Sequence, residues 1–181
     1  MKEFSILSWV YDLGKVALIL LVIGLFIHYF VMTIFALEGA SMEPNFIDKE
    51  YVLVNRIAYL NKTPERGDAV LLKFPGREEQ KYIKRVIGLP GEKIKISNGK
   101  VYINDTILKE EYLPYDINTE PDMEETLRNN EYFVLGDNRD NSNDSRIWGT
   151  CPKKNFIGRA IFIVYPFSQW STVTPTNYSA I

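Results

Sequence analysis

Residues 93–104 read KIKISNGKVYIN, two short runs in which apolar and polar residues alternate, joined by Asn98-Gly99. Alternation with a period of two predicts strands with one buried face, because successive side chains of a strand point to opposite sides of the sheet. Asn-Gly between two such runs is a strong signal for a two-residue hairpin turn. The stretch therefore predicts an antiparallel hairpin.

Further β-rich runs, each bounded by turn residues, lie on both sides of this hairpin. They cover residues 51–54, 69–72, 82–87, 132–135 and 160–165. Together they predict a mainly β domain built of antiparallel sheets. Residues 105–130 are polar and acidic and contain Pro114 and Pro121, which predicts a loop-rich insertion placed to cover a site. The polar tail after Phe167 is predicted to fray.

Residues 16–37 read VALILLVIGLFIHYFVMTIFAL, an uncharged apolar run long enough to cross a bilayer as one helix. A buried core helix and a cleavable signal peptide are the alternatives. The run is longer than the ~7–15 apolar residues of a signal peptide, and Leu37-Glu38-Gly39-Ala40 is a poor cleavage site. Lys2 and Lys15 precede the run and Glu43 follows it, which favours a cytoplasmic N-terminus.

The predicted organisation is a short cytoplasmic N-terminus at residues 1–15, a transmembrane helix at 16–37 and an extracytoplasmic catalytic domain at 38–181. This makes the chain a single-pass protein of the cell membrane with its domain on the extracellular face. Roughly 140 residues beyond the anchor are enough for one domain with a core. The net charge of -2 and the dispersed basic residues argue against nucleic acid as a partner.

The chain has one cysteine, Cys151, and one histidine, His28, which lies inside the apolar run. These counts exclude a disulfide within the chain and a cysteine-based zinc cluster, and they argue against a zinc hydrolase. They also exclude a Ser-His-Asp triad in the β domain. A serine nucleophile in this chain therefore needs a different base.

Ser41 follows the apolar run in Gly39-Ala40-Ser41-Met42-Glu43-Pro44. Small residues before it allow a substrate backbone to approach, and its own N–H is placed to stabilise an oxyanion. The alternative is a serine that caps a short helix. Lys84, within residues 82–87, is the candidate base, because burial among apolar groups lowers the pKa of a lysine. The alternative is a solvent-facing lysine on a strand.

Residues 136–146 read GDNRDNSNDSR and follow a β run directly, which predicts a tight loop leaving a sheet. Asp137, Asp144 and Arg146 can pair as ions, and the Ser142 hydroxyl can orient a lysine amine. A calcium loop on Asp140, Ser142 and Asp144 is an alternative. An EF-hand, however, needs glycine where Ser145 stands and glutamate where Cys151 stands.

Taken in this order, the apolar run and the segments at residues 39–44, 66–68, 82–91 and 136–146 resemble the type I signal peptidases (leader peptidases), in the short form of Gram-positive bacteria. These are serine–lysine peptidases. The resemblance implies that Ser41 is the nucleophile and Lys84 the general base. It implies a supporting set of Ser142, Asp137, Asp144 and Arg146, and substrate-binding pockets lined by Leu37, Met42, Phe46, Tyr82 and Ile83.

The activity that this resemblance implies is a membrane-anchored serine endopeptidase that removes signal peptides from exported preproteins. Cleavage follows a small-x-small motif such as Ala-x-Ala and uses no cofactor or metal. The implied partners are preprotein signal peptides, the lipid bilayer and the secretion translocon. One departure is Gly39, where some members carry a serine whose hydroxyl helps the oxyanion hole; here that site rests mainly on the Ser41 N–H.

Other functions stay open on the sequence. A membrane-tethered β domain without catalysis, binding calcium or a protein partner, belongs to a different class. A self-cleaving repressor shares the serine–lysine pair but needs a DNA-binding region, where this chain has an apolar segment. An inactive paralogue is a third alternative, although Ser41 and Lys84 are both present.

Overall fold

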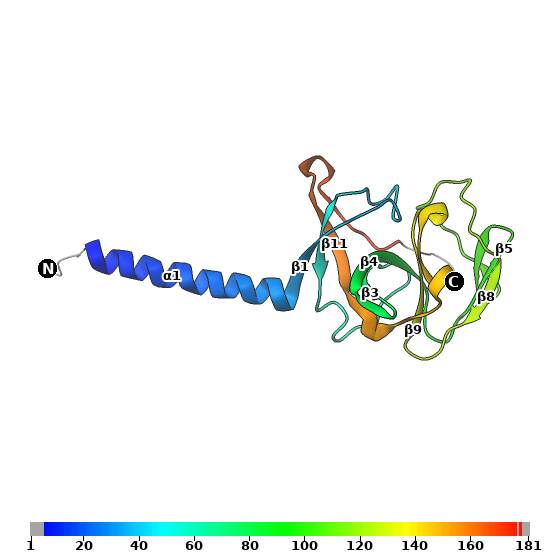
Figure 1. Cartoon of the computed structure of the whole chain (residues 1–181), viewed down its shortest axis with the longest axis horizontal. Helices are drawn as coiled ribbons and strands as arrows, with labels where there is room; N and C mark the ends of the chain where they lie inside the picture. The colour runs from blue at the N-terminus through cyan, green and yellow to red at the C-terminus, as the bar shows by residue number, and fades with distance from the viewer. Residues whose placement is uncertain (1–5, 177, 179–181) are drawn as a thin grey trace.

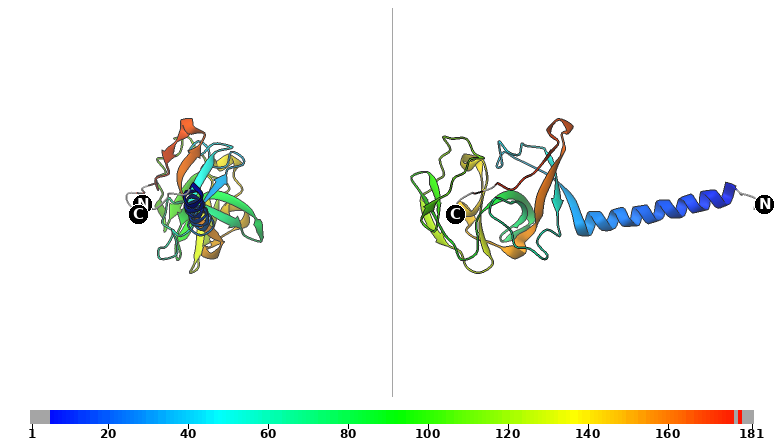
Figure 2. Two further views of the ribbon diagram at one scale, coloured as in Figure 1. Left: turned by 90° about the vertical axis from the view of Figure 1, so that its left-hand side faces the viewer. Right: turned by 180° about the vertical axis from the view of Figure 1, so that it is seen from behind.

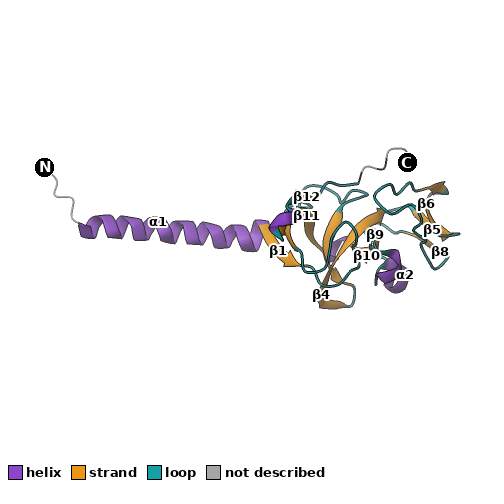
Figure 3. Ribbon diagram, turned by 90° about the horizontal axis from the view of Figure 1, so that it is seen from above, coloured by secondary structure: helices purple, strands orange, loops and turns teal. Residues whose placement is uncertain are grey.

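The structure is a computed structural model that describes residues 6–176 and Tyr178. One long helix, α1 (Ile6–Phe26), projects from a body made mostly of strands (Figure 1). A turn of π-helix, Ile27–Val31, leads directly into the first strand, β1 (Met32–Ala36). The predicted fold class, a mainly β antiparallel domain on one N-terminal apolar helix, is confirmed (Figure 3).

The main sheet has eight strands, all paired antiparallel, in the order β1-β2-β11-β3-β4-β9-β10, with β12 beside β11. Most of these strands coincide with the predicted runs. Their bounds are β2 (Tyr51–Asn55), β3 (Ala69–Phe74), β4 (Arg77–Gly88), β9 (Glu131–Leu135), β10 (Cys151–Pro152), β11 (Phe156–Tyr165) and β12 (Ser171–Thr172).

A second sheet of four strands lies at the end of the body away from α1 (Figure 3). Its order is β7 (Thr106–Ile107), β6 (Lys100–Ile103), β5 (Lys93–Ser97) and β8 (Met123–Thr126). Asn98 and Gly99 have φ of 51° and 75°, as the predicted hairpin turn requires. Residues 105–130 are thus not only loop: β7 and β8 lie within them and flank the hairpin.

Three buried apolar clusters form the core. One joins β2, β3 and β11 to the segment after β1 and includes Leu37, Met42 and Phe46. The second lies under the small sheet around β5 and β6. The third packs between β3, β4 and β9 and contains the single cysteine, Cys151, which is fully buried.

The bounds predicted for the apolar helix were wrong at both ends. The prediction placed the helix at residues 16–37. The helix already includes Ile6, and the helical segment ends at Val31, because Met32–Ala36 pairs antiparallel with β2. An apolar run of threonine, isoleucine and phenylalanine suits a half-buried strand as well as it suits lipid, so composition alone does not separate the two. Ser8–Val31 is long and apolar enough to cross a membrane.

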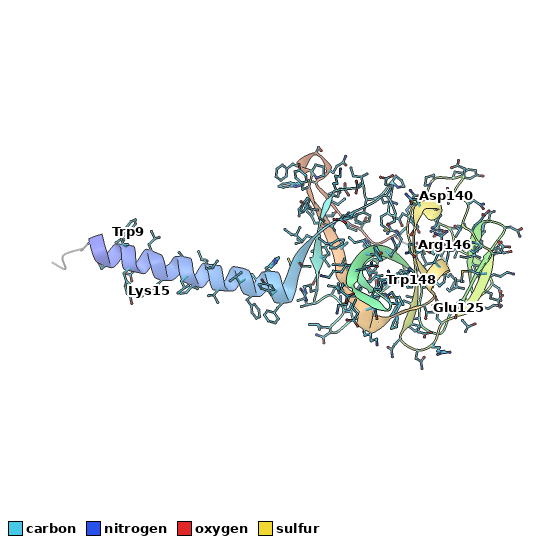
Figure 4. The ribbon with its side chains drawn as sticks, viewed as in Figure 1. Trp9, Lys15, Glu125, Asp140, Arg146 and Trp148 are labelled. Atoms are coloured by element: carbon cyan, nitrogen blue, oxygen red, sulfur yellow. The ribbon has the colours of Figure 1, made fainter. Side chains whose placement is uncertain are left out.

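Seen from behind, α1 stands clear of the body (Figure 2, right). Its apolar side chains are therefore exposed within the described part of the chain, and Leu20 is 63% exposed. Trp9 and Lys15 lie near the start of the helix, far from the body (Figure 4).

The C-terminal segment does not fray as predicted within the described residues. β12 pairs with β11, and Val173 N donates a hydrogen bond to Ile161 O. Farther on, Thr176 accepts a hydrogen bond from Arg85, and Tyr178 packs against the core cluster of the small sheet.

Candidate active site

Ser41 and Lys84 lie in direct contact. Ser41 is on the turn that follows β1, and Lys84 is on β4, which is paired on both sides, by β3 and β9. Lys84 Nζ donates a hydrogen bond to Ser41 Oγ at 2.6 Å. The lysine is only 1% exposed, whereas Ser41 is half-buried. This is the distance that a proton transfer between nucleophile and base requires.

Burial gives the amine of Lys84 a basicity suited to this task. Desolvation lowers the pKa of Lys84 to about 8, and the nearby carboxylates of Asp144 and Asp137 offset only part of that effect. Lys84 makes its hydrogen bond to a hydroxyl rather than to a carboxylate. A substantial fraction of Lys84 is therefore neutral, and able to accept a proton, at mildly alkaline pH.

The predicted loop at residues 136–146 contacts Ser41 from behind. Asn138 N donates a hydrogen bond to Ser41 O at 3.1 Å. A Cβ on Gly136 would lie 2.2 Å from Ser142 Oγ and 2.4 Å from Ser41 O, so only glycine fits where these segments meet. Ser142 Oγ is buried and has no hydrogen-bond partner among the described residues. The prediction that Ser142 orients Lys84 stays a prediction.

The ion pairs of this loop differ in part from the expected set. Asp144 is fully buried and accepts two hydrogen bonds of 2.8 Å from the Arg146 guanidinium and one of 3.0 Å from Gly136 N. Arg146 lies on the short helix α2 (Ser145–Trp148), next to the loop (Figure 4). Asp140 is exposed at the surface, apart from the buried Asp144, which gives the alternative calcium site no support.

Asp137 pairs with Arg85, a residue that the sequence analysis did not single out. Arg85 Nε donates to Asp137 Oδ1 at 2.8 Å and Arg85 Nη2 donates to Asp137 Oδ2 at 2.6 Å. Both residues are buried. Asn45 Nδ2 also donates to Asp137 Oδ2, so the pair reaches the segment that carries Ser41. Its position next to Lys84 was the only sequence signal for Arg85.

Arg139 is a second buried arginine that was missed. It donates hydrogen bonds to Glu110, to Thr119 Oγ1 at 2.7 Å and to Gly136 O at 2.9 Å. Glu110 and Thr119 belong to the insertion at residues 105–130. That segment therefore supports the loop behind Ser41, whereas the sequence analysis expected it to cover the site.

A cavity of about 470 Å³ opens beside Ser41, between the segment after β1 and the outer half of β4. Four of the predicted pocket residues line it: Leu37, Met42, Tyr82 and Ile83. Phe46 is not among the lining residues but packs in the same buried cluster as Leu37, Met42 and Ile83. The lining residues that were not predicted are Phe35, Ala36, Glu38, Gly39, Glu79, Gln80 and Lys81. The strand residues at the end of β1 and in β4 suit a peptide in extended conformation.

Gly39 lies in this cavity wall with φ of 85° and open space where a Cβ would stand. Its N–H donates a 2.7 Å hydrogen bond to Asp48 Oδ1. The N–H of Gly39 is therefore already used by the protein, which leaves the N–H of Ser41 as the backbone donor nearest to the nucleophile.

The fold thus brings a serine hydroxyl and a buried lysine amine together beside a cavity. Residues 10–165 match the family described as signal peptidase, peptidase S26. The chain belongs to this family, and it is a peptidase.

Two relatives of similar length support the same assignment. Signal peptidase I P of Bacillus subtilis subsp. natto is 35% identical over 179 residues, which covers 93% of each chain. Signal peptidase IB of Staphylococcus aureus (strain COL) is 32% identical over 184 residues, 92% of this chain and 93% of its own. A solved structure of a signal peptidase I from Enterococcus faecalis V583 has a TM-score of 0.48 and 32% identity, covering 54% of this chain and 97% of that chain.

Proposed function

We propose that the chain is a membrane-anchored serine endopeptidase in which Ser41 is the nucleophile and Lys84 the general base. The observation that carries this proposal is the 2.6 Å contact between Ser41 Oγ and the buried amine of Lys84 at the edge of the cavity. A lysine buried next to a hydroxyl, with a pKa lowered to about 8, has a use in catalysis that an ordinary structural lysine lacks.

The reaction begins with neutral Lys84. Ser41 Oγ attacks the carbonyl carbon of the scissile peptide bond while its proton passes to Lys84 Nζ. The negative charge on the carbonyl oxygen is held by the Ser41 N–H. When the tetrahedral intermediate collapses, the C–N bond breaks and the Lys84 ammonium gives its proton to the leaving amine.

The acyl group left on Ser41 is then removed by water. Neutral Lys84 takes a proton from the attacking water, and the ester bond breaks with return of the proton to Ser41 Oγ. Ser142, Asp137, Asp144 and Arg146 act by holding the loop and the amine in place, not by contact with substrate. No step uses a metal or a cofactor.

The substrates are the signal peptides of exported preproteins, cut after a small-x-small motif such as Ala-x-Ala. The names of the relatives support the substrate class. The apolar walls of the cavity at Leu37, Met42 and Ile83, which pack into the core, support uncharged side chains at the cleavage site.

The helical segment Ser8–Val31 crosses the membrane, and the body lies on the outer face. The exposed apolar side chains of α1 support the crossing, and the lysine distribution noted in the sequence supports a cytoplasmic N-terminus. The shared bilayer brings enzyme and signal peptide together, and the secretion translocon is the source of the substrate.

The test is cleavage of a preprotein with an Ala-x-Ala site in detergent and lipid by wild type, Ser41→Ala and Lys84→Ala. Circular dichroism shows that each variant is folded. We expect correctly placed cleavage by the wild type alone. Activity of folded Lys84→Ala at the wild-type level would refute the role of lysine, and a folded wild type that cuts nothing would refute the proposed function.

A further inference from the structure

The C-terminal segment runs from the end of the main sheet next to α1 across the body towards the second sheet (Figures 1 and 2). Val173 packs against the core cluster that contains Met42 and Ile83. Tyr178, at the other end, packs against the core cluster of the small sheet. The segment thus contacts both sheets, and Thr176 lies between these two contacts in the chain.

Thr176 makes a partly buried polar contact with Arg85 between these two packing contacts. Arg85 Nη1 donates a 2.9 Å hydrogen bond to Thr176 Oγ1 and another of 2.9 Å to Gly67 O. The remaining hydrogen bonds of the guanidinium go to Asp137, and its flat face lies 4.4 Å from the ring centre of Tyr112. Thr176 is therefore one of the acceptors that fix the orientation of a buried arginine.

Gly67 shows how closely the segment approaches. A Cβ on Gly67 would lie 2.3 Å from Thr176 O and 2.9 Å from Thr176 N. Gly67 has φ of 94° and is buried. The glycine of Arg66-Gly67-Asp68 is thus the residue that allows the C-terminal segment to lie against Arg85.

The arginine that Thr176 holds leads directly to the nucleophile. Arg85 carries both oxygens of Asp137, and the next residue, Asn138, donates its N–H to Ser41 O. Lys84 directly precedes Arg85 on β4. A change in the orientation of the Arg85 side chain therefore acts on the backbone that carries Lys84. Two short paths therefore join Thr176 to the two groups that react.

We propose that residues 173–176 together with Tyr178 form a strap that positions the catalytic pair, and that Thr176 is its positioning residue, acting through Arg85 and Asp137. This inference rests on the proposed function. Thr176 touches neither Ser41 nor substrate. Its effect is on the alignment of Ser41 with Lys84 and on the exclusion of water from Lys84.

The test compares Thr176→Val, which keeps the shape but removes the acceptor, with Thr176→Ser, which keeps the hydroxyl. Both are made in the full chain and assayed in detergent. For Thr176→Val we expect kcat to fall about tenfold, the effect of one hydrogen bond to a charged group, with KM nearly unchanged. Thr176→Ser should restore kcat to near the wild-type value.

The pH profile distinguishes positioning from a loss of stability. Looser packing admits water to Lys84, so the acid limb of kcat/KM should move to higher pH in Thr176→Val and stay in place in Thr176→Ser. Kinetics are measured at a temperature at which circular dichroism shows all three proteins folded. Equal kcat values and equal acid limbs of the kcat/KM profile in wild type and Thr176→Val would overturn the proposal. Equal losses of kcat in Thr176→Val and Thr176→Ser would also overturn it.

A readout that needs no turnover separates this proposal from the proposed function. NMR of isotopically labelled lysine follows the deprotonation of Lys84, assigned with Lys84→Arg. We expect its midpoint to rise in Thr176→Val and not in Thr176→Ser. A wild type that cuts no preprotein would refute the proposed function, while an unchanged midpoint would refute the strap.

Discussion

The helix α1 and the strand β4 distribute polarity in opposite ways. In α1, Leu18 and Leu20 are 61% and 63% exposed, whereas in β4 Lys84 and Arg85 are 1% and 3% exposed. Exposed apolar surface on this scale needs a partner outside the chain, and buried charge needs a partner inside it. The first partner is a bilayer, on the proposed function, and the second lies within the protein.

The two buried charges differ from one another as well. Arg85 has a carboxylate, and its hydrogen bonds to Asp137 outweigh the cost of burial and raise its pKa. Lys84 has the hydroxyl of Ser41 and a lowered pKa. On the proposed function, neighbouring residues of one strand thus have different tasks: Arg85 supports the site, and Lys84 is left reactive.

The sharpest test of this difference is Lys84→Met, a neutral side chain of similar length. We expect kcat to fall roughly 10³-fold or more, because the general base is lost. The melting temperature should stay the same or rise, because an unfavourable buried charge is removed. Lys109→Met, at an exposed position, is the matched control and should change neither quantity. A Lys84→Met variant with lowered stability would contradict this difference between Lys84 and Arg85.

Removal of the partner of Arg85 should lower stability, in contrast to Lys84→Met. Asp137→Asn leaves a buried guanidinium without its carboxylate, which we expect to lower the free energy of unfolding by about 3–5 kcal/mol. The exposed pair Lys73–Glu78 provides the control, and Glu78→Gln should leave the free energy of unfolding nearly unchanged. Both are measured by chemical denaturation of the full chain in detergent. Equal losses would show that burial of the Arg85–Asp137 pair does not matter.

A charge placed in α1 should affect only the insertion of this helix into the membrane. Leu20→Asp, in the middle of α1, should make insertion less favourable by about 3 kcal/mol. The fraction of protein that stays with membranes after alkaline extraction should fall, while activity in detergent stays unchanged. Ile107→Asp, at an exposed position of β7, should leave the membrane fraction intact. Extraction of both variants to the same extent would argue against a spanning helix.

The smallest expected effect is the graded response to pH. Because the pKa of Lys84 is about 8, kcat/KM should be highest above that pH and fall about tenfold per pH unit in acid. The charged groups that act on this amine are Asp144 and Asp137, which raise its pKa, and Arg146, which lowers it. Initial rates of cleavage across the pH range measure this fall of kcat/KM in acid. A rate that stays constant down to pH 6 would exclude Lys84 as the base.

Stability should respond to the same group with a defined sign. The folded state lowers the pKa of Lys84 relative to the unfolded chain, so its charge costs stability at neutral pH. That cost, roughly 3 kcal/mol, should be relieved as pH rises from about 8 to above 10. Denaturation midpoints should therefore show a rise in wild type over this window that Lys84→Met lacks.

Local pattern was enough to predict much of the fold, whereas the two residues at the centre of the candidate site were predicted from the family resemblance of the segments that carry them. The hairpin around Asn98-Gly99 and most long strands follow from alternation and turn residues, which act over a few positions. Ser41 and Lys84 stood out because the histidine count left few other choices. Their contact is a long-range fact of the fold, and only the structure gives it.

What the sequence did not predict depends on contacts between distant segments. The end of the apolar helix is decided by pairing of β1 with β2, since the same apolar residues suit lipid and sheet. Arg85 and Asp137 are 52 positions apart, and nothing in the pattern around either one identifies the other. The tail looked polar and free because its anchor, Arg85, belongs to another part of the chain.

The junction between α1 and β1 has a mechanical consequence. The helical segment ends at Val31 and the hydrogen-bonded strand begins at Met32, with no loop between them. Ser41 is the tenth residue after Val31, so the chain limits its distance from the helix end to about 35 Å. Because β1 is paired with β2 from Met32 to Ala36, there is no flexible linker at this junction about which the body could rotate relative to the helix. Strand register therefore sets both the height of Ser41 above the helix end and the direction in which the cavity beside it faces.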